Sequence, residues 1–260
     1  MPLYIGARRV LLGAPGIRWT PASPTSDGGV LPHTWHYAGS PQLYTDAAKT
    51  MVASSDGDFV YVSTNQGSDT HDIVQATAGN RPTLKLNIVN GKPVFRLDGT
   101  DGLQGAFGAA LTQPFTLCIV AQLGAGCAND NSLYVLSDGD DAINAVYIGK
   151  TSAGDPDRFY FHAGTAQYGG AANENWNIWT ALLNGASSGL WHNGISQVQA
   201  NAGAYVMDGL TLGQRNPGDY DWIGDIAEYL IYDSDLSDAD KDQIGHYLAT
   251  KYGLSWTNFT

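Results

Sequence analysis

Closely spaced turn signals constrain the fold of this chain more than any other feature of its sequence. The 260 residues include 32 glycines and 11 prolines, spread along the chain without the fixed period of a collagen or a solenoid. The segments between them are short and rich in β-branched and aromatic residues, as is typical of a β-sandwich or barrel. We predict strands at residues 59–63, 83–89, 93–98, 115–122, 132–136, 145–148, 158–162, 177–183, 189–192, 209–213 and 223–232.

The connections between these strands favour antiparallel pairing. Asn-Gly pairs begin at residues 90, 184 and 193, and they indicate hairpin turns because such turns need positive φ at both central residues. Strands do not alternate with helices, which argues against a parallel nucleotide-binding sheet.

One helix is predicted, at residues 237–252. Ser237 is a suitable N-cap with Asp240 three residues later, and Gly253 ends the segment. Ile244 and Leu248 fall on one side of this helix. We expect it to cover an open end or edge of the sheets.

Composition limits the classes of partner. The length and a hydrophobic content of 43% suit one main all-β domain. The formal charge of −12 repels phosphate backbones and anionic lipid surfaces, so we expect no nucleic-acid partner. No apolar segment approaches the length of a membrane span, so we expect no membrane insertion. Two cysteines do not make a disulfide framework, and Cys118 lies in an apolar run that predicts burial.

The first forty residues differ from the rest. Residues 1–40 are rich in Pro, Gly, Ser and Thr and contain the adjacent basic pair Arg8-Arg9. They are either an attachment or oligomerisation arm or a tail that packs on its own domain, which we place at residues 41–260. The start of the chain lacks the pattern of a secretory signal. A protein of this kind that acts outside a cell is expected to leave by lysis or on a particle.

Aromatic residues beside amides form the best binding candidate. Tyr168 precedes two glycines, and Asn173, Asn175 and Trp176 come after them in what reads as a Gly-rich loop. Rings of this kind stack on the C–H faces of sugars while amides bind hydroxyl groups. Core packing is the alternative for each ring.

A second aromatic pair, Tyr220 and Trp222, is predicted on the loop before the last strand. Carboxylates flank this pair, and its two rings are further ligand-binding candidates.

Acidic turns are the candidates for a cation site. Asp138, Asp140 and Asp141 surround one glycine and are able to supply oxygen ligands to Ca²⁺, the one cofactor that the sequence suggests. A solvated acidic turn is the favoured alternative. For Asp98 and Asp101 we expect turn hydrogen bonding by Asp98 rather than metal binding.

Catalysis has no positive signal in the sequence. Glu228 lies within an apolar strand and is either a paired structural group, which we favour, or a general acid with a raised pKa. A glycosidase needs a second carboxylate at a defined separation, and the sequence identifies none. The six histidines lack metal-ligand spacing, and nucleophile motifs are absent.

Six segments in order carry a resemblance to a known family. They are Asp56-Gly57-Asp58; Gln75-Ala76-Thr77-Ala78 with Arg81-Pro82; residues 95–103; Pro114-Phe115-Thr116; Leu190-Trp191-His192-Asn193-Gly194; and residues 224–253. Across about residues 42–254 the chain resembles a laminin-G-like, concanavalin-A-like jelly roll of the type found in bacteriophage particles and bacterial surface proteins. Relatives carry Asp-x-Ser-Gly-x-Gly where this chain has residues 65–69, so an ion site in that loop is not expected to carry over.

The resemblance implies two antiparallel sheets, packed face to face, with one C-terminal helix, and members of the family are usually binding modules. The leading hypothesis is a non-enzymatic phage virion protein, a capsid decoration or tail fibre, located on the virion surface. It would attach to other virion proteins through its N-terminal arm and bind cell-surface or environmental glycans, as a homo-oligomer since weak sugar sites gain from several copies. The alternatives are a polysaccharide hydrolase or lyase on the same fold and an adhesion module on a bacterial cell surface.

Overall fold

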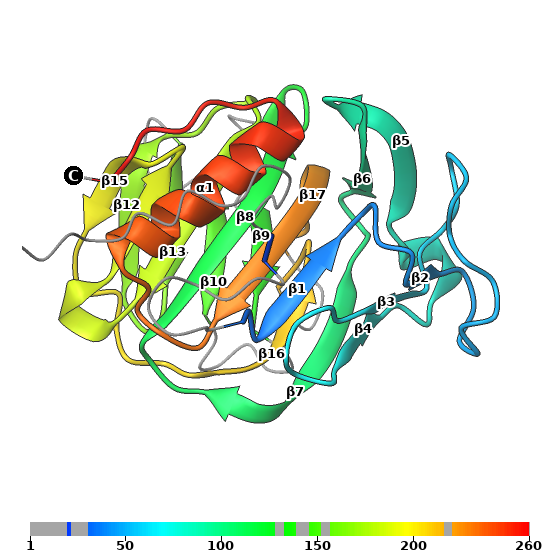
Figure 1. Ribbon diagram of the computed structural model, residues 1–260, viewed down its shortest axis with the longest axis horizontal. Coiled ribbons are helices and arrows are strands. Elements are labelled where there is room, and N and C mark those ends of the chain that lie inside the picture. The colour runs from blue at the N-terminus through cyan, green and yellow to red at the C-terminus, as the bar shows by residue number, and fades with distance from the viewer. Residues whose placement is uncertain are drawn as a thin grey trace, which may run out of the picture.

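Two antiparallel sheets packed face to face make up the body of the protein, and one helix lies across the outer face of one of them (Figure 1). This computed structural model describes residues 20–21, 31–127, 133–138, 146–151, 157–215 and 220–259. The predicted all-β jelly-roll sandwich with one C-terminal helix is confirmed.

The two sheets are called sheet A and sheet B. In spatial order, sheet A consists of β15 (Ile195–Gln199), β14 (Gly189–His192), β13 (Asn177–Leu183), β8 (Phe115–Leu123), β17 (Ile223–Tyr232), β6 (Lys92–Asp98) and β5 (Thr83–Val89), and β1 (Thr34–Tyr37) also pairs with β17. Sheet B consists of β12 (Ala166–Ala171), β11 (Arg158–His162), β10 (Tyr147–Thr151), β9 (Leu133–Ser137), β16 (Met207–Leu212), β7 (Leu103–Leu111), β4 (Asp72–Val74), β3 (Val62–Thr64) and β2 (Leu43–Tyr44). Short 3₁₀ turns lie at η1 (Ala78–Asn80) and η3 (Gly185–Ser187).

Strand β8 shows why sheet A has apolar side chains on both faces. Leu117, Ile119 and Ala121 point into the core between the sheets, whereas Cys118 and Val120 point outward toward the helix. Period-two alternation therefore sends every side chain of this run to a buried surface. The predicted burial of Cys118 is confirmed.

The helix α1 (Asp238–Tyr252) begins and ends as predicted. The Ser237 hydroxyl accepts a hydrogen bond from the Asp240 backbone N–H, and Gly253 closes the helix at φ 67°. Ile244 and Leu248 pack with outward-facing residues of β8 and β17. The helix thus covers the outer face of sheet A instead of an end or edge (Figure 1). The reason is that this face is apolar and would otherwise be exposed to water.

Residues 31–40 contribute to the sandwich. In β1, Thr34 pairs with Ile231 and Tyr37 pairs with Glu228 of β17. The sandwich therefore begins ahead of residue 41. Residues 1–19 lie outside the described part of the chain, and the attachment role of the N-terminal arm stays a prediction.

Two of the three Asn-Gly pairs form the expected turns. Asn90 and Asn193 have φ of 47° and 52°, and the glycine after each has positive φ as well. Asn184 instead has φ −151° and leads into η3. Within the described residues, no helix is long and apolar enough to cross a membrane.

Candidate functional site

Five tyrosines gather on the outer face of sheet B, and we call them the tyrosine face: Tyr134, Tyr147, Tyr160, Tyr168 and Tyr220. Ring centroids lie 6.2 Å apart for Tyr160 and Tyr168, 5.5 Å for Tyr134 and Tyr160, and 5.0 Å for Tyr134 and Tyr147. Tyr220 meets Tyr134 edge to face at 5.2 Å. The rings form one connected surface across β9 to β12, since such separations allow favourable aromatic contact.

Strand register brings these rings together. Tyr160 and Tyr168 are cross-strand partners, and Gly149 of β10 lies opposite both Tyr134 and Tyr160. A side chain on Gly149 would collide with the Leu133 carbonyl. Because the glycine leaves this position empty, the rings of its two partners meet across it.

The two ends of the tyrosine face are open to solvent. Tyr168 is 41% exposed and Tyr220 is 42% exposed, whereas the three tyrosines between them are buried. Tyr220 has φ 55°, in the left-handed region, which costs a non-glycine residue about 1 kcal/mol. Its carbonyl accepts a hydrogen bond from the Tyr134 N–H at 2.9 Å. The fold thus holds the backbone of Tyr220 beside Tyr134 at some cost in backbone energy.

Arg215 adds a positive charge to the tyrosine face. Its guanidinium lies 4.4 Å from the centre of the Tyr220 ring and 6.0 Å from that of Tyr147, which is cation–π geometry. Exposed rings, phenolic hydroxyls and a guanidinium together are suited to binding a flat or polyhydroxylated ligand, through stacking and hydrogen bonds.

The predicted aromatic loop is divided between two parts of the molecule. Tyr168 lies in strand β12, not in a loop. Asn173 Oδ1 accepts hydrogen bonds from Asn175 N and Asn177 Nδ2, so it shapes a turn. Trp176 packs with the cluster beneath α1, on the far side of the sandwich from Tyr168. The structure therefore does not bring these four residues into one site.

The second aromatic pair is also divided. Tyr220 belongs to the tyrosine face, but Trp222 is completely buried in the core between the sheets, 6.1 Å from Trp179. Its predicted role in ligand binding is wrong, because strand alternation at the start of β17 turns it inward.

Sequence reasoning missed Tyr134, Tyr147, Tyr160 and Arg215. Each of the three tyrosines is next to a residue of the core between the sheets, Val135, Ile148 or Phe161. Alternation along β9, β10 and β11 therefore marks these tyrosines as outward-facing. The sequence did not show which of these rings meet, because that depends on the register of the three strands, including the irregularity between Ile148 and Gly149.

The predicted Ca²⁺ ligands are described only in part. Asp138 is 6% exposed, and its Oδ1 accepts a hydrogen bond from the Asp208 N–H. Asp140 and Asp141 lie outside the described residues, so a Ca²⁺ site there stays a prediction. Over the described ranges, no three His, Cys, Asp or Glu residues group as a metal site would require.

Asp98 bonds the turn that comes after it, as predicted. Its Oδ1 accepts hydrogen bonds from the N–H and the hydroxyl of Thr100, at 3.0 Å and 2.8 Å. Burial, followed by the charges of Asp98 and Asp221, raises the pKa of Asp101 to about 6. Asp101 Oδ2 accepts a hydrogen bond from the Asp98 N–H.

Glu228 is a paired structural group. Its side chain is fully buried in sheet A beneath α1, and four donors converge on it. They are Trp35 Nε1 at 2.6 Å, Lys251 Nζ at 2.7 Å, Tyr252 Oη at 2.8 Å and Tyr247 Oη at 3.2 Å. Burial, followed by the charge of Glu228, raises the pKa of Tyr247 and Tyr252. A substrate has no access to this carboxylate, so it is not a catalytic acid.

Solved structures of other proteins share the fold of this chain. No family model matches the sequence, and no curated protein does. A structure of a GH54 a-l-arabinofuranosidase soaked with a cyclic sulfate inhibitor is 11% identical, with a TM-score of 0.60, over 86% of this chain and 63% of that chain. The CBM40 of the Ruminococcus gnavus IT-sialidase, bound to alpha2,3 sialyllactose, is 18% identical over 53% of this chain and 83% of its own, with a TM-score of 0.40. The likeness to the arabinofuranosidase shows a shared β-sandwich fold.

Proposed function

We propose that this domain is a non-enzymatic glycan-binding module whose binding surface is the tyrosine face. The observation that carries the proposal is the pair of exposed rings, Tyr168 and Tyr220, at the two ends of one connected row of tyrosines. A sugar chain that lies along the row would stack on both exposed rings, with Arg215 beside one of them.

The proposed mechanism is preorganised stacking. The buried rings of Tyr134 and Tyr160 support the exposed rings of Tyr220 and Tyr168, so little side-chain freedom is lost when a ligand binds. Phenolic hydroxyls and the Arg215 guanidinium would donate to sugar oxygens at the edges of the rings.

The setting that we propose is the surface of a phage particle, as a capsid decoration or tail-fibre domain attached through the part of the N-terminal arm that precedes β1. Its support is the ordered set of laminin-G-like motifs in the sequence. Display in several copies, as a homo-oligomer, would raise the avidity of a weak sugar site. Display on a bacterial cell surface is the alternative setting.

A polysaccharide hydrolase or lyase remains the alternative activity, with Asp101 as the acidic residue to test. Its carboxyl is nearly buried and accepts a hydrogen bond from the Asp98 N–H, and burial raises its pKa to about 6. To decide between an enzyme and a non-enzymatic binding module, the protein is incubated with a panel of polysaccharides. New reducing ends or unsaturated sugars are then measured. Cleavage that is lost in Asp101→Asn would overturn the non-enzymatic proposal.

The binding proposal is tested on a glycan array that includes sialyllactose and arabinosides, with wild type, Tyr168→Ala, Tyr220→Ala and Phe59→Ala. Phe59 is a matched control because its ring is exposed, at 56%, and does not belong to the tyrosine face. We expect specific binding by wild type and the control and its loss in both tyrosine variants. Binding that survives in both would place the site elsewhere.

A further inference from the structure

A pocket lies on the other side of the sandwich from the tyrosine face, between the start of α1 and the edge of sheet A. Its volume is about 320 Å³, and its walls include Trp191 of β14, Lys241 of α1, Asp235, Asp238 and Phe259. This volume is at the lower end of the range for small-molecule sites, which suits one small ligand.

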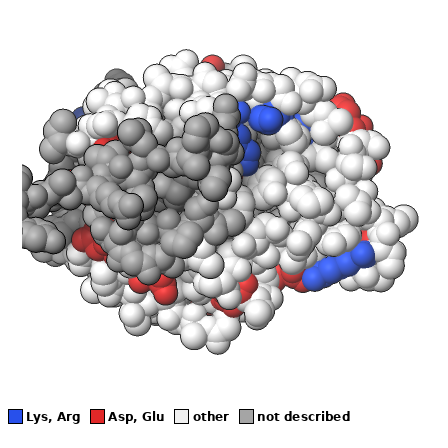
Figure 2. Space-filling view, in the orientation of Figure 1, with Lys and Arg blue, Asp and Glu red and all other residues white. Residues whose placement is uncertain are grey.

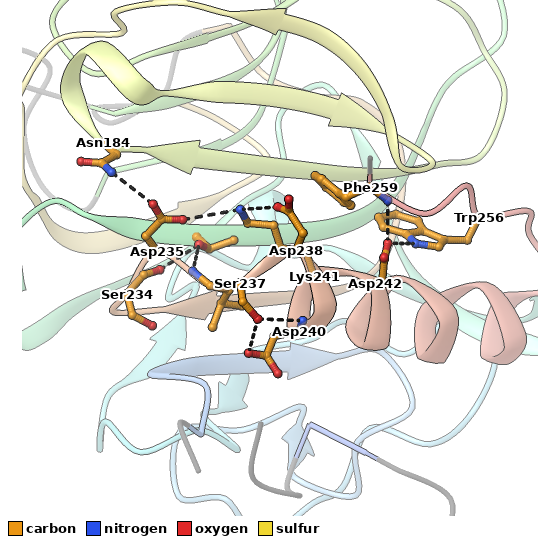
Figure 3. Close-up of polar contacts among 12 residues, drawn as sticks. Asn184, Ser234, Asp235, Ser237, Asp238, Asp240, Lys241, Asp242, Trp256 and Phe259 are labelled. Atoms are coloured by element: carbon orange, nitrogen blue, oxygen red, sulfur yellow. Dashed lines mark hydrogen bonds and ion pairs between the residues drawn. The ribbon is translucent and has the colours of Figure 1, made fainter. Parts of the chain in front are cut away.

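The pocket holds a buried ammonium group with long contacts. The Lys241 side chain is 6% exposed, and its Nζ lies 3.5 Å from Asp235 Oδ1 and 3.4 Å from Asp238 Oδ1 (Figure 3). Ordinary N–H···O bonds are about 2.7–3.2 Å long, so these contacts are weak for a charge removed from water. A ligand oxygen within reach of Nζ would improve its solvation.

Two aromatic rings form a corner beside this group. The centroids of Trp191 and Phe259 are 5.1 Å apart and the rings are inclined at 49°. Asp242 accepts hydrogen bonds from Phe259 N and Trp256 Nε1, and so holds the C-terminal segment in place (Figure 3). The corner is thus a fixed part of the pocket.

The charges of the pocket select the class of ligand. Two carboxylates against one ammonium make the lining negative, and this disfavours anions such as acidic sugars or phosphates. A cation is disfavoured because Lys241 already lies 5.7 Å from the Trp191 ring and 5.6 Å from the Phe259 ring, where a cationic ligand would sit. A neutral ligand with an apolar face and several hydroxyl groups satisfies both limits.

We propose that this pocket binds one uncharged sugar residue. The sugar ring would lie against Phe259 and the part of the Trp191 ring that lines the pocket, which is small because Trp191 is 8% exposed. Its hydroxyls would donate to Asp235 and Asp238, and one hydroxyl oxygen would accept from Lys241. The pocket lies on the α1 side of sheet A and shares no residue with the tyrosine face, so the proposal does not depend on that site. With both sites filled, one domain would hold two sugar residues.

The test is an NMR titration with uncharged methyl hexosides and methyl N-acetylhexosaminides, monitored through the indole N–H signal of Trp191. The signal is assigned from its absence in Trp191→Phe. We expect a saturable shift of this signal with at least one sugar. The Asp235→Asn/Asp238→Asn double variant is expected to weaken binding by about tenfold, because an amide oxygen accepts a hydroxyl hydrogen bond less strongly than a carboxylate does.

Two controls make the result decisive. Asp208→Asn removes an exposed carboxylate on sheet B and should bind as wild type does. Tyr168→Ala, which tests the tyrosine face, should leave the Trp191 shift unchanged. The absence of a saturable Trp191 shift with every sugar, or an unchanged affinity in the double variant, would overturn the proposal.

Discussion

Glu228 illustrates at the residue scale how a carboxylate is held inside an apolar sheet. Because four donors surround it, the cost of removing the charge from water is offset by charge-assisted hydrogen bonds. The sequence predicted a paired Glu228, but its side chain lies on the outer face of sheet A, against α1, and not in the core between the sheets. The sequence did not identify the partners, since Trp35 and Lys251 are 193 and 23 residues away.

Glu228→Gln should destabilise the protein strongly. It leaves the ammonium of Lys251 partly buried without a counter-charge, which costs about 3 kcal/mol for a pair of this kind. Urea unfolding would measure the loss, with Asp208→Asn as an exposed control. A loss below about 1 kcal/mol, the range of a surface pair, would contradict this account of Glu228.

Buried histidines predict how stability depends on pH. Burial lowers the pKa of His33, His36 and His71, and lowers that of His192 to about 3. The unfolded chain binds protons at these positions below about pH 6.5, and the folded chain binds them only at lower pH, so stability falls as pH falls below about 7. Asp101 has an opposite effect of about 1 kcal/mol, because its pKa is about 6 in the folded state, so the folded chain takes up a proton there as pH falls from 7 to 5.

His192→Phe should flatten this pH dependence. The His192 ring packs 4.6 Å from Phe159 and 4.9 Å from Trp179, so a phenyl ring keeps the packing and removes the titration. From the pKa of about 3, His192 alone accounts for about 2 kcal/mol of stability lost between pH 7 and pH 5. Urea unfolding of both proteins at the two pH values measures it. An unchanged pH slope would show that His192 titrates normally in the folded state.

Among the elements, the helix and the strands that the sequence predicted are those with strong local signals, namely apolar and β-branched composition in the strands and capping residues at both ends of the helix. Strands β8, β13 and β17 are rich in apolar, β-branched and aromatic residues, and α1 has both caps. Strands β7 and β12 were not predicted, since they are rich in Gly and Ala and have little intrinsic strand preference. They form strands because neighbouring strands in sheet B supply their hydrogen-bond partners, and those partners lie elsewhere in the sequence.

Ser237→Ala tests the cap of α1. Loss of the side-chain hydrogen bond to Asp240 N should cost about 1 kcal/mol. This corresponds to a fall in Tm of roughly 2–4 °C for a domain of this size. Thermal unfolding monitored by circular dichroism gives the shift, and Ser255→Ala, in the exposed C-terminal segment, is the control. Equal Tm values for the two variants would contradict the assigned cap.

At the scale of the whole molecule, the sandwich presents two different outer faces. Sheet A is covered by α1, and on the face drawn in Figure 2 acidic residues scatter around the rim while Lys and Arg occupy only a few places. Sheet B carries the tyrosine face on its own outer side. The sequence named Tyr168 and Tyr220 as separate candidates. Their assembly into one row depends on the order β12-β11-β10-β9 of sheet B, which no local pattern encodes.

Isothermal titration of the strongest array glycan measures whether the tyrosine face binds it. The titration uses wild type, the two single tyrosine variants and the double variant Tyr168→Ala/Tyr220→Ala. Loss of one stacked ring should raise Kd by about tenfold, as for a hot-spot contact worth more than about 1 kcal/mol. The double variant should bind more weakly than either single variant. An unchanged Kd in the double variant would show that the tyrosine face is not where this protein binds glycans.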